Sequence, residues 1–317
     1  MQHAFDTTSL SNQLTPKQML QEIKYSGAAF KLGFVMLLLV TFVPLIIFAC
    51  VASQIVTDVG ALFFIVMVAG GGLFGLRDLY RELNEIAMAR QFAVANGLEF
   101  YRDLSVTNYP GTPFRVRIYV PYTMRSPGGQ FIEFGQLRPI WQSRRSNGSP
   151  TQTFMRFKLP IALPHMVLRS RKSEVNVLDS VGDSVKLKLE GKFGDMFDLY
   201  VPKGYERDAL YIFTPDVMER FIDATPNFDC EIIGDELYFY STKKIHFIYP
   251  QNLSKLIAIF NHVMQKFARQ SSKYRDERLE VTGRQAQMTM KSSPVANAVL
   301  IVFCLLVIAS VVLHFVK

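Results

Sequence analysis

The sequence predicts an α+β fold: a mixed domain with an antiparallel-rich sheet, joined to three transmembrane helices. Three apolar runs without a charged residue extend over residues 32–52, 59–76 and 295–316. Each is close to the roughly 20 residues that a helix needs to cross the hydrocarbon core of a bilayer. Between the second and third runs, short alternating segments bounded by Gly, Pro and Ser are typical of strands, and amphipathic segments are typical of helices.

The first two apolar runs are separated only by a short polar break around Asp58, so we expect a membrane hairpin over residues 32–76. Neither run has a polar face to present to water. A G-x-G-x-x-G match begins at Gly70, but a membrane helix offers neither the strand nor the soluble helix that a dinucleotide site requires. Gly71 and Gly75 form a G-x-x-x-G pair, which predicts close packing against another helix or another membrane protein.

Lysine and arginine residues flank the runs unevenly. Lys24 and Lys31 precede the first run and Arg77 follows the second, whereas the break between them holds only Asp58. The positive-inside rule therefore places both ends of the hairpin in the cytoplasm, at the inner (plasma) membrane, and we expect no cleavable signal. The expected parts are a cytosolic N-terminal segment, the hairpin, a cytosolic α+β domain, a charged linker and a C-terminal transmembrane anchor, at residues 1–31, 32–76, 77–270, 271–293 and 294–317.

Helical signals flank the hairpin on both sides. Residues 15–18 (Thr-Pro-Lys-Gln) form a capping box with proline at the first helical position. This box predicts either an amphipathic helix on the membrane surface or a helical lead-in to the first span. Residues 77–96 keep helical spacing up to the stop signal Gly97. The second span is therefore expected to continue into the cytoplasm as one rod that orients the domain.

Strand patterns dominate the middle of the chain. Alternation and bounding turn residues predict strands over residues 114–120, 131–137, 154–159, 185–189, 197–201 and 209–213. The last of these is expected to be central because it is richly apolar. Residues 228–233 and 236–241 are expected to form a hairpin about the two-residue turn Gly234-Asp235. Residues 142–152 predict an exposed loop.

Two amphipathic helices complete the predicted domain. Thr214, Pro215 and Asp216 carry three start signals: a hydroxyl cap, proline at the first position and a carboxylate near the positive end of the helix dipole. Residues 252–269 predict the second helix. Its apolar stripe consists of Leu253, Leu256, Phe260, Val263 and Phe267.

Several stretches carry a pattern seen in a known family. The positions are Leu189-Glu190-Gly191, Phe193, Phe197, Leu199-Tyr200, Tyr205-Glu206, Leu210 to Pro215 and Met218-Glu219-Arg220, together with Phe92-Ala93 and Asn96 to Phe100. Over roughly residues 80–245 they resemble a family of uncharacterised bacterial membrane proteins. The resemblance implies two N-terminal transmembrane helices ahead of a cytosolic mixed domain. It implies no activity, because the shared positions are of structural types such as Phe, Gly and Pro.

No constellation for metal binding, cofactor binding or catalysis stands out. The five histidines include no H-x-x-x-H pair, so we expect neither a metal site nor a cofactor. Cys230 is interpreted as a small buried thiol and not as a nucleophile, because Phe228, Cys230 and Ile232 share one strand face. The other two cysteines lie inside apolar runs, so no disulfide framework is expected.

The best carboxylate cluster is the candidate ligand or partner site. It centres on Glu206, Arg207 and Asp208, with Asp195 and Asp198 nearby in the sequence. One interpretation is that these are solvated turn residues balanced by neighbouring cations, and this one is favoured. The alternative is a membrane-anchored enzyme or small-ligand sensor that uses the Glu206/Asp208 region.

Charge is distributed unevenly along the domain. Residues 102–172 hold 12 Lys or Arg against 2 Asp or Glu (net +10), and residues 173–236 hold 6 against 15 (net −9). If the basic stretch is separate in space, it would face anionic lipid headgroups, at about 1 kcal/mol per cation. Otherwise the two stretches simply attract each other. The candidate lipid-facing residues are Arg115, Arg117, Arg144, Arg145, Arg169, Arg171 and Lys172.

These patterns together predict an integral membrane protein that presents a cytosolic α+β binding or scaffolding domain at the inner membrane face. Membrane lipids are the expected partners. Nucleic acid is not favoured, because no recognisable module with interleaved aromatic residues is present. An enzymatic role is left open and is the less favoured interpretation.

Overall fold

A computed structural model describes most of the central part of the chain. The described residues are 5–11, 15–25, 35, 38, 42, 59–104, 109–115, 118–127, 132–139, 151–173, 181–241, 243–247, 249–276, 278 and 288–290. Only the backbone is described for 9, 11, 16, 19, 20, 25, 59–69, 132, 139, 181, 182, 289 and 290. The third apolar run, nearly all of the first and most of the predicted loop at 142–152 therefore lie outside the described residues. In the described part, no helix is both long and apolar enough to cross a membrane.

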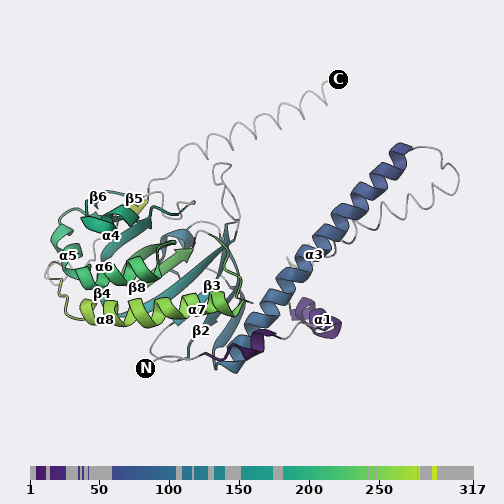
Figure 1. Cartoon of the computed structure of the whole chain (residues 1–317), viewed down its shortest axis with the longest axis horizontal. Helices are drawn as coiled ribbons and strands as arrows, with labels where there is room; N and C mark the ends of the chain where they lie inside the picture. Colours follow the sequence, from purple (N-terminus) through teal and green to yellow (C-terminus); the bar gives the residue numbers. More distant parts are fainter. Residues whose placement is uncertain are drawn as a thin grey trace, which may run out of the picture.

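The longest helix, α3, begins at Val59 and continues without a break to Ala95. The expected continuation of the second apolar run as one helix is thus confirmed. Figure 1 shows this helix leaving the body of the molecule as a rod. Its last third is buried in the core through Leu83, Ile86, Ala89, Phe92 and Ala93, whereas Leu73 and Phe74 are 67% and 64% exposed. After the helix, Gly97 adopts a positive φ of 64°, as expected for a helix stop.

The N-terminal segment lies against this rod. A short 3-10 helix η1 (Thr8–Ser11) precedes helix α1 (Pro16–Tyr25). The predicted capping box is confirmed: the Thr15 N–H donates to Gln18 Oε1 at 2.9 Å, and the Gln18 N–H donates to Thr15 Oγ1 at 3.4 Å. Helix α1 then contacts the rod and the first strand through Glu22, whose Oε2 lies 3.2 Å from Arg90 Nη2 and 3.1 Å from Arg102 Nη1.

An antiparallel sheet forms the centre of the domain, which confirms the predicted α+β class. Strands follow the order β1-β2-β3-β4-β7-β6, and β8 pairs with the other edge of β4. A separate two-stranded pair joins β5 to β9. The bounds are β1 Glu99–Leu104, β2 Ile118–Arg125, β3 Ile132–Pro139, β4 Gln152–Ser170, β5 Val181–Gly182, β6 Ser184–Leu187, β7 Phe197–Pro202, β8 Phe228–Ser241 and β9 Thr289–Met290.

The predicted hairpin about Gly234-Asp235 is wrong. Residues 228–241 form one strand, β8, that runs along β4 from Cys230 opposite Leu168 to Tyr240 opposite Phe154. Gly234 does have the positive φ of 64° that the predicted turn required. It lies opposite Leu163, however, at an irregularity in the pairing of β8 with β4. A glycine of this kind suits a bulge as well as a turn, and the 19-residue partner strand decides between them.

Two predicted strands also need correction. Residues 112–115 form a 3-10 helix, η3 (Thr112–Arg115), and the strand starts only at Ile118. Residues 209–213 belong largely to helix α5 (Glu206–Ile212), in which Ala209 and Ile212 are buried at i, i+3 spacing. That spacing is helical, so the apolar run covers one side of a short helix and does not form a central strand.

Helices cover one face of the sheet, which we call the helical face (Figure 1). They are α4 (Gly191–Met196), α6 (Pro215–Ala224), and a continuous succession of α7 (Pro250–Ala258), the π-helical segment η4 (Ile259–Met264) and α8 (Gln265–Ser271). The helices predicted to start at Thr214 and to extend over residues 252–269 are therefore confirmed, but the Thr214 hydroxyl does not make the capping hydrogen bond that was expected. Their apolar side chains join the end of α3 and the sheet in one hydrophobic cluster that includes Phe213, Phe221, Phe239 and Phe267.

The opposite face, which we call the polar face, is covered by short segments. Tyr109 and Phe114 stack on each other at 4.6 Å between ring centroids, and Phe114 meets Phe154 of the sheet edge-on at 5.1 Å. Met288, just before β9, is buried in the same smaller cluster. Charged residues of the sheet are enclosed beneath this cover, and they are described below.

Candidate functional site

The larger of the two pockets described here, about 620 Å³, opens where the chain leaves β6 and turns through α4 into β7. Leu187 is the last residue of β6 paired with β7, opposite Leu199. Gly194 allows α4 to approach the departing chain, because a Cβ there would collide with the carbonyl oxygen of Leu189. The lining residues are Arg171, Lys186, Leu187, Lys188, Leu189, Glu190, Gly191, Gly194, Asp195, Phe197 and Asp198.

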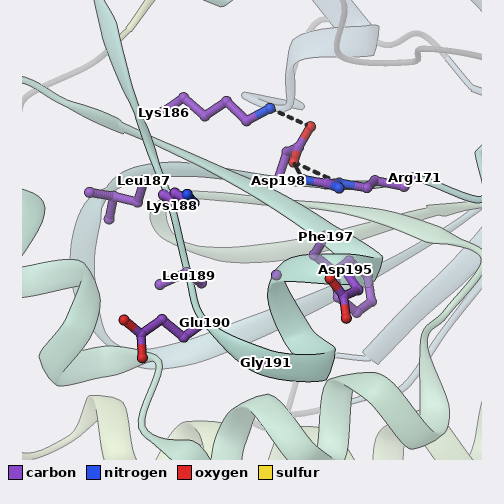
Figure 2. Close-up of a pocket in the computed structure, with 11 residues that line it drawn as sticks. Arg171, Lys186, Leu187, Lys188, Leu189, Glu190, Gly191, Asp195, Phe197 and Asp198 are labelled. Carbon is purple, nitrogen blue, oxygen red and sulfur yellow. Dashed lines mark hydrogen bonds and ion pairs between the residues drawn. The ribbon is translucent and has the colours of Figure 1, made fainter.

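Asp198 organises one side of this pocket. It accepts hydrogen bonds from Arg171 Nη2 at 2.8 Å and from Lys186 Nζ at 2.8 Å, and Figure 2 shows it between these two cations. Burial acts to raise the pKa of Asp198, but the hydrogen bonds and charges of Lys186 and Arg171 outweigh it, so the pKa lies below its usual value. Glu190 and Asp195 lie on the other side of the pocket, away from these cations (Figure 2).

The chemistry of this pocket favours binding of a polar ligand. Its volume falls within the roughly 300–1,000 Å³ range of ligand sites, but such sites are mostly apolar and enclosed. Here six of the eleven lining residues are charged, three of each sign. The pocket therefore suits a ligand or peptide segment that carries both signs of charge, and it does not resemble a closed cavity that excludes water.

The predicted Glu206–Arg207–Asp208 site lies at the start of α5, and neither described pocket includes it. Asp208 is already engaged: Tyr274 Oη donates to its Oδ1 at 2.9 Å, and Arg278 Nη2 donates to its Oδ2 at 2.6 Å. The Arg278 guanidinium also lies 4.0 Å from the centre of the Tyr205 ring. Asp208 thus attaches the segment after α8 to α5. Of the four carboxylates in the predicted cluster, only Asp195 and Asp198 line one of the described pockets.

The predicted basic residues are scattered, and Arg117, Arg144 and Arg145 lie outside the described residues. Arg115 is exposed on η3 and donates from Nε to the Pro110 carbonyl at 3.3 Å. The other three are close to the end of β4. Arg169 lies over the Tyr200 ring at 5.9 Å, Arg171 pairs with Asp198, and Lys172 is exposed.

The basic and acidic stretches are not separate in space. Strand β4 belongs to the basic stretch and pairs along its length with β8 of the acidic one. Ion pairs connect the two: Arg156 with Glu236, Lys158 with Asp235 at 2.9 Å, and Arg171 with Asp198 at 2.8 Å. The structure therefore favours the interpretation in which the two stretches attract each other.

The polar face contains a buried charge network that the sequence did not reveal. Glu133 is fully buried, and it accepts from Thr123 Oγ1 at 3.0 Å and from Arg156 Nη1 at 3.2 Å, as well as from Tyr109 Oη. Arg156 Nε donates to Glu236 Oε2 at 2.9 Å on its other side. Burial and the charge of Glu133 raise the pKa of Tyr109 far above its usual value, so this phenol stays a proton donor.

A buried histidine lies in the same face. His165 Nδ1 accepts the N–H of Met288 at 3.1 Å, so its Nε2 carries the proton and donates to Glu231 Oε1 at 2.9 Å. Glu231 also accepts the Thr112 N–H at 2.8 Å and Tyr240 Oη at 3.1 Å. Through these hydrogen bonds, both segments that cover the polar face, residues 109–115 and 288–290, are bound to the sheet.

Two expectations from the sequence concern Cys230 and metals. Cys230 is buried, and burial together with the charge of Asp229 raises the pKa of its thiol well above the usual value, which confirms the interpretation as a buried thiol. Within the described ranges, no group of three or more His, Cys, Asp or Glu side chains is arranged to hold a metal ion.

A second pocket, of about 460 Å³, lies between α3 and residues 244–249. Sequence reasoning missed it, although the helical spacing of Asp78, Glu82 and Glu85 was a usable signal for one charged helix side. Glu85 is 3% exposed and accepts from Lys244 Nζ at 2.7 Å and from His246 Nδ1 at 3.0 Å. Burial acts to raise the pKa of Glu85, but these partners outweigh it and hold the pKa below its usual value.

Comparisons with known proteins add little to this geometry. No protein-family model matches the sequence, and no curated protein matches it. Among solved structures, the fold is similar to the crystal structure of the mycobacterial trehalose monomycolate transport factor A, with 10% sequence identity and a TM-score of 0.42, over 59% of this chain and 94% of that one. A likeness at this level identifies neither a family nor a function.

Proposed function

We propose that the protein is an integral membrane protein that presents a non-catalytic α+β binding or scaffolding domain at the inner face of the plasma membrane. The observation that carries this proposal is the continuity of α3. One helix contains both the apolar run 59–76 and the buried residues Leu83 and Phe92 of the domain core. Because a continuous helix transmits position and rotation, a span in the bilayer would fix the distance and orientation of the domain.

The binding part of the proposal is supported by the charged pocket beside α4. Its exposed Lys188, Glu190 and Asp195 have no ion pair with another described residue, so they are available to a partner. Asp208, by contrast, has both carboxylate oxygens occupied by Tyr274 and Arg278. A general base needs a free oxygen within hydrogen-bond reach of its substrate, which disfavours Asp208 as the general base of the enzyme alternative.

The anchoring is tested by topology mapping of the full chain in sealed spheroplasts. Asp58→Cys places a thiol in the predicted outer turn, and Lys192→Cys places one on the exposed surface of α4. A membrane-impermeant maleimide is expected to label position 58 in intact spheroplasts and position 192 only after lysis. The unsubstituted chain gives the background from its own cysteines. Labelling of position 192 in intact spheroplasts, or a chain that is monodisperse without detergent, overturns the proposal.

The binding role is tested by photo-crosslinking in living cells. A benzophenone amino acid at Lys188, within the pocket, is compared with the same residue at Lys255, an exposed position of α7 outside it. A discrete adduct is expected at position 188 only, and adding Asp195→Lys should abolish it. Equal adducts at both positions, or an adduct that survives Asp195→Lys, would remove the pocket from the proposal.

A further inference from the structure

The pocket between α3 and residues 244–249 has two uncompensated charges at its mouth. Inside it, Glu85 is paired with Lys244 and contacts His246, and Glu82 is paired with Arg138 at 3.1 Å. Asp78 and Arg81 also line the pocket, and both are exposed. Neither has an ion pair with any residue in the described part of the chain. The pocket thus presents one free anion and one free cation, three residues apart on the same helix.

Two aromatic side chains lie at the same opening. Tyr80 is 39% exposed and Tyr249 is 50% exposed, and both line the pocket. The His246 ring meets Tyr249 edge-on at 6.2 Å between centroids, which holds that tyrosine beside the Glu85 group. An aromatic face next to a carboxylate is a favourable site for an ammonium group, and an exposed guanidinium is the usual partner of a phosphate.

We infer that this pocket binds a zwitterionic group in which a primary ammonium is joined to a phosphate, as in the headgroup of an ethanolamine phospholipid. Arg81 binds the phosphate and Asp78 binds the ammonium, and the Tyr80 and Tyr249 rings line the same opening. A purely anionic headgroup would place a like charge next to Asp78. A purely cationic ligand would place a like charge next to Arg81. The pairing of the two free charges therefore selects a ligand with both signs.

The position of the pocket along α3 agrees with a headgroup, and this step rests on the proposed anchoring. Asp78 and Arg81 follow the end of the apolar run at Leu76 by two and five residues. At about 1.5 Å per residue, they lie about 3 and 8 Å beyond the hydrocarbon boundary. The headgroup layer on each side of a bilayer is about 5–8 Å thick. The mouth of the pocket is therefore at the depth where phosphates and ammonium groups lie.

The test uses the full chain purified in detergent, with lipid binding measured by native mass spectrometry. Phosphatidylethanolamine, its N-acylated form and phosphatidylglycerol are compared with identical acyl chains. We expect phosphatidylethanolamine to bind most tightly. Asp78→Asn should weaken it about fivefold without affecting phosphatidylglycerol, and Arg81→Gln should weaken both lipids about fivefold. Arg77→Gln is the matched control, because Arg77 is exposed on the same turn of α3 but does not line the pocket.

The outcomes separate this inference from the proposed function. Equal binding of phosphatidylethanolamine and its N-acylated form, or an Arg77→Gln effect as large as that of Arg81→Gln, overturns the inference alone. A chain that stays monodisperse without detergent overturns the anchoring instead. Free phosphoethanolamine distinguishes two sources of the same chemistry: displacement of the lipid at millimolar concentration means that the soluble compound also binds, and failure to displace it restricts the site to the lipid.

Discussion

The two faces of the central sheet are filled by different kinds of interaction. On the helical face, Phe221 meets Phe213, Phe239 and Phe267 at 5.6–5.9 Å between ring centroids. On the polar face, the fully buried Glu133 depends on Arg156, on Arg125 and on neighbouring hydroxyl groups. Apolar burial is non-directional and sums over many contacts, whereas a buried charge needs each partner in place. The helical face should therefore lose stability in proportion to volume removed, and the polar face according to which charge loses its partner.

The largest effect is expected from Arg156→Met on the polar face. This change leaves Glu133 and Glu236 as two buried carboxylates without their shared cation. Removing one partner of a buried pair costs about 3–5 kcal/mol. Glu133 keeps Arg125 Nη2 at 3.4 Å and Glu236 keeps the Tyr238 hydroxyl, but both carboxylates lose Arg156 at once, so we expect a loss of about 5 kcal/mol of unfolding free energy. Urea unfolding of the full chain in detergent micelles, followed by circular dichroism, measures the loss.

The matched control for this variant adds Glu133→Gln and Glu236→Gln. Replacing a buried ionic group by neutral side chains of similar size is often close to neutral. Only Arg125 then keeps its charge, and its side chain is 28% exposed and reaches solvent, so the triple variant should recover more than half of the loss. A triple variant less stable than Arg156→Met would show that the carboxylates are not the source of the cost, and it would remove the contrast between the faces.

Phe221→Ala gives the corresponding measurement on the helical face. Phe221 is fully buried, and its removal leaves a cavity among three other aromatic rings. The expected loss is about 4 kcal/mol of unfolding free energy, from lost transfer energy and the cavity. Phe221→Leu should cost less than half as much, because most of the volume stays filled. Equal losses for Ala and Leu would mean that this face also depends on specific partners.

Glu85→Gln tests a single buried carboxylate, located where α3 meets residues 244–246. The variant keeps the side-chain size but removes the charge that Lys244 and His246 face, at an expected cost of about 2 kcal/mol at pH 7. The folded-state pKa of Glu85 lies below its usual value of 4.5, so its contribution is complete above pH 4.5 and is lost as pH falls through the folded-state value. The gap in unfolding free energy between the two proteins should therefore narrow below pH 4.5. A gap that widens on acidification would contradict this assignment.

The helical face was predictable and the polar face was not, for a physical reason. The stripe from Leu253 to Phe267 repeats at helical spacing, and that local pattern alone is enough to place it in a core. Glu133 occupies a position in β3 that an alternating pattern would leave exposed. Its partners come from Tyr109, Thr123 and Arg156, so nothing near it in the sequence indicates burial.

The same distinction holds at the candidate site. Asp195 and Asp198 were singled out as part of a carboxylate cluster, and both line a pocket. Asp198 is paired with two cations, Arg171 and Lys186, which come from two other strand regions. No spacing in the sequence predicts this pairing. Asp208 was selected on the same grounds, but it is occupied by Tyr274 and Arg278 from beyond the last helix of the domain.

Gly234→Ala tests the backbone irregularity in the pairing of β8 with β4. Its φ of 64° lies in the left-handed region, where a Cβ costs about 1–2 kcal/mol. We expect a loss of about 1 kcal/mol of unfolding free energy, without the larger penalty that a changed strand pairing would bring. Gly97→Ala is the matched comparison, because Gly97 has the same φ of 64° at the end of α3. A loss at position 234 several times that at 97 would indicate that the bulge sets the register of β8.

The smallest effect is expected at Lys158 and Asp235, an ion pair that connects the basic and acidic stretches at 2.9 Å. Their side chains are 52% and 42% exposed, so solvent screens the attraction, and exposed pairs of this kind contribute about 0–1 kcal/mol. Asp235→Asn should therefore change the unfolding free energy by less than about 1 kcal/mol, and 0.5 M salt should reduce that difference further. The Arg156 network should show no such salt dependence, because its carboxylates are shielded from ions in solution. If both responded to salt alike, the charges of the polar face would have to be accessible to solvent, and the contrast between the two faces would not hold.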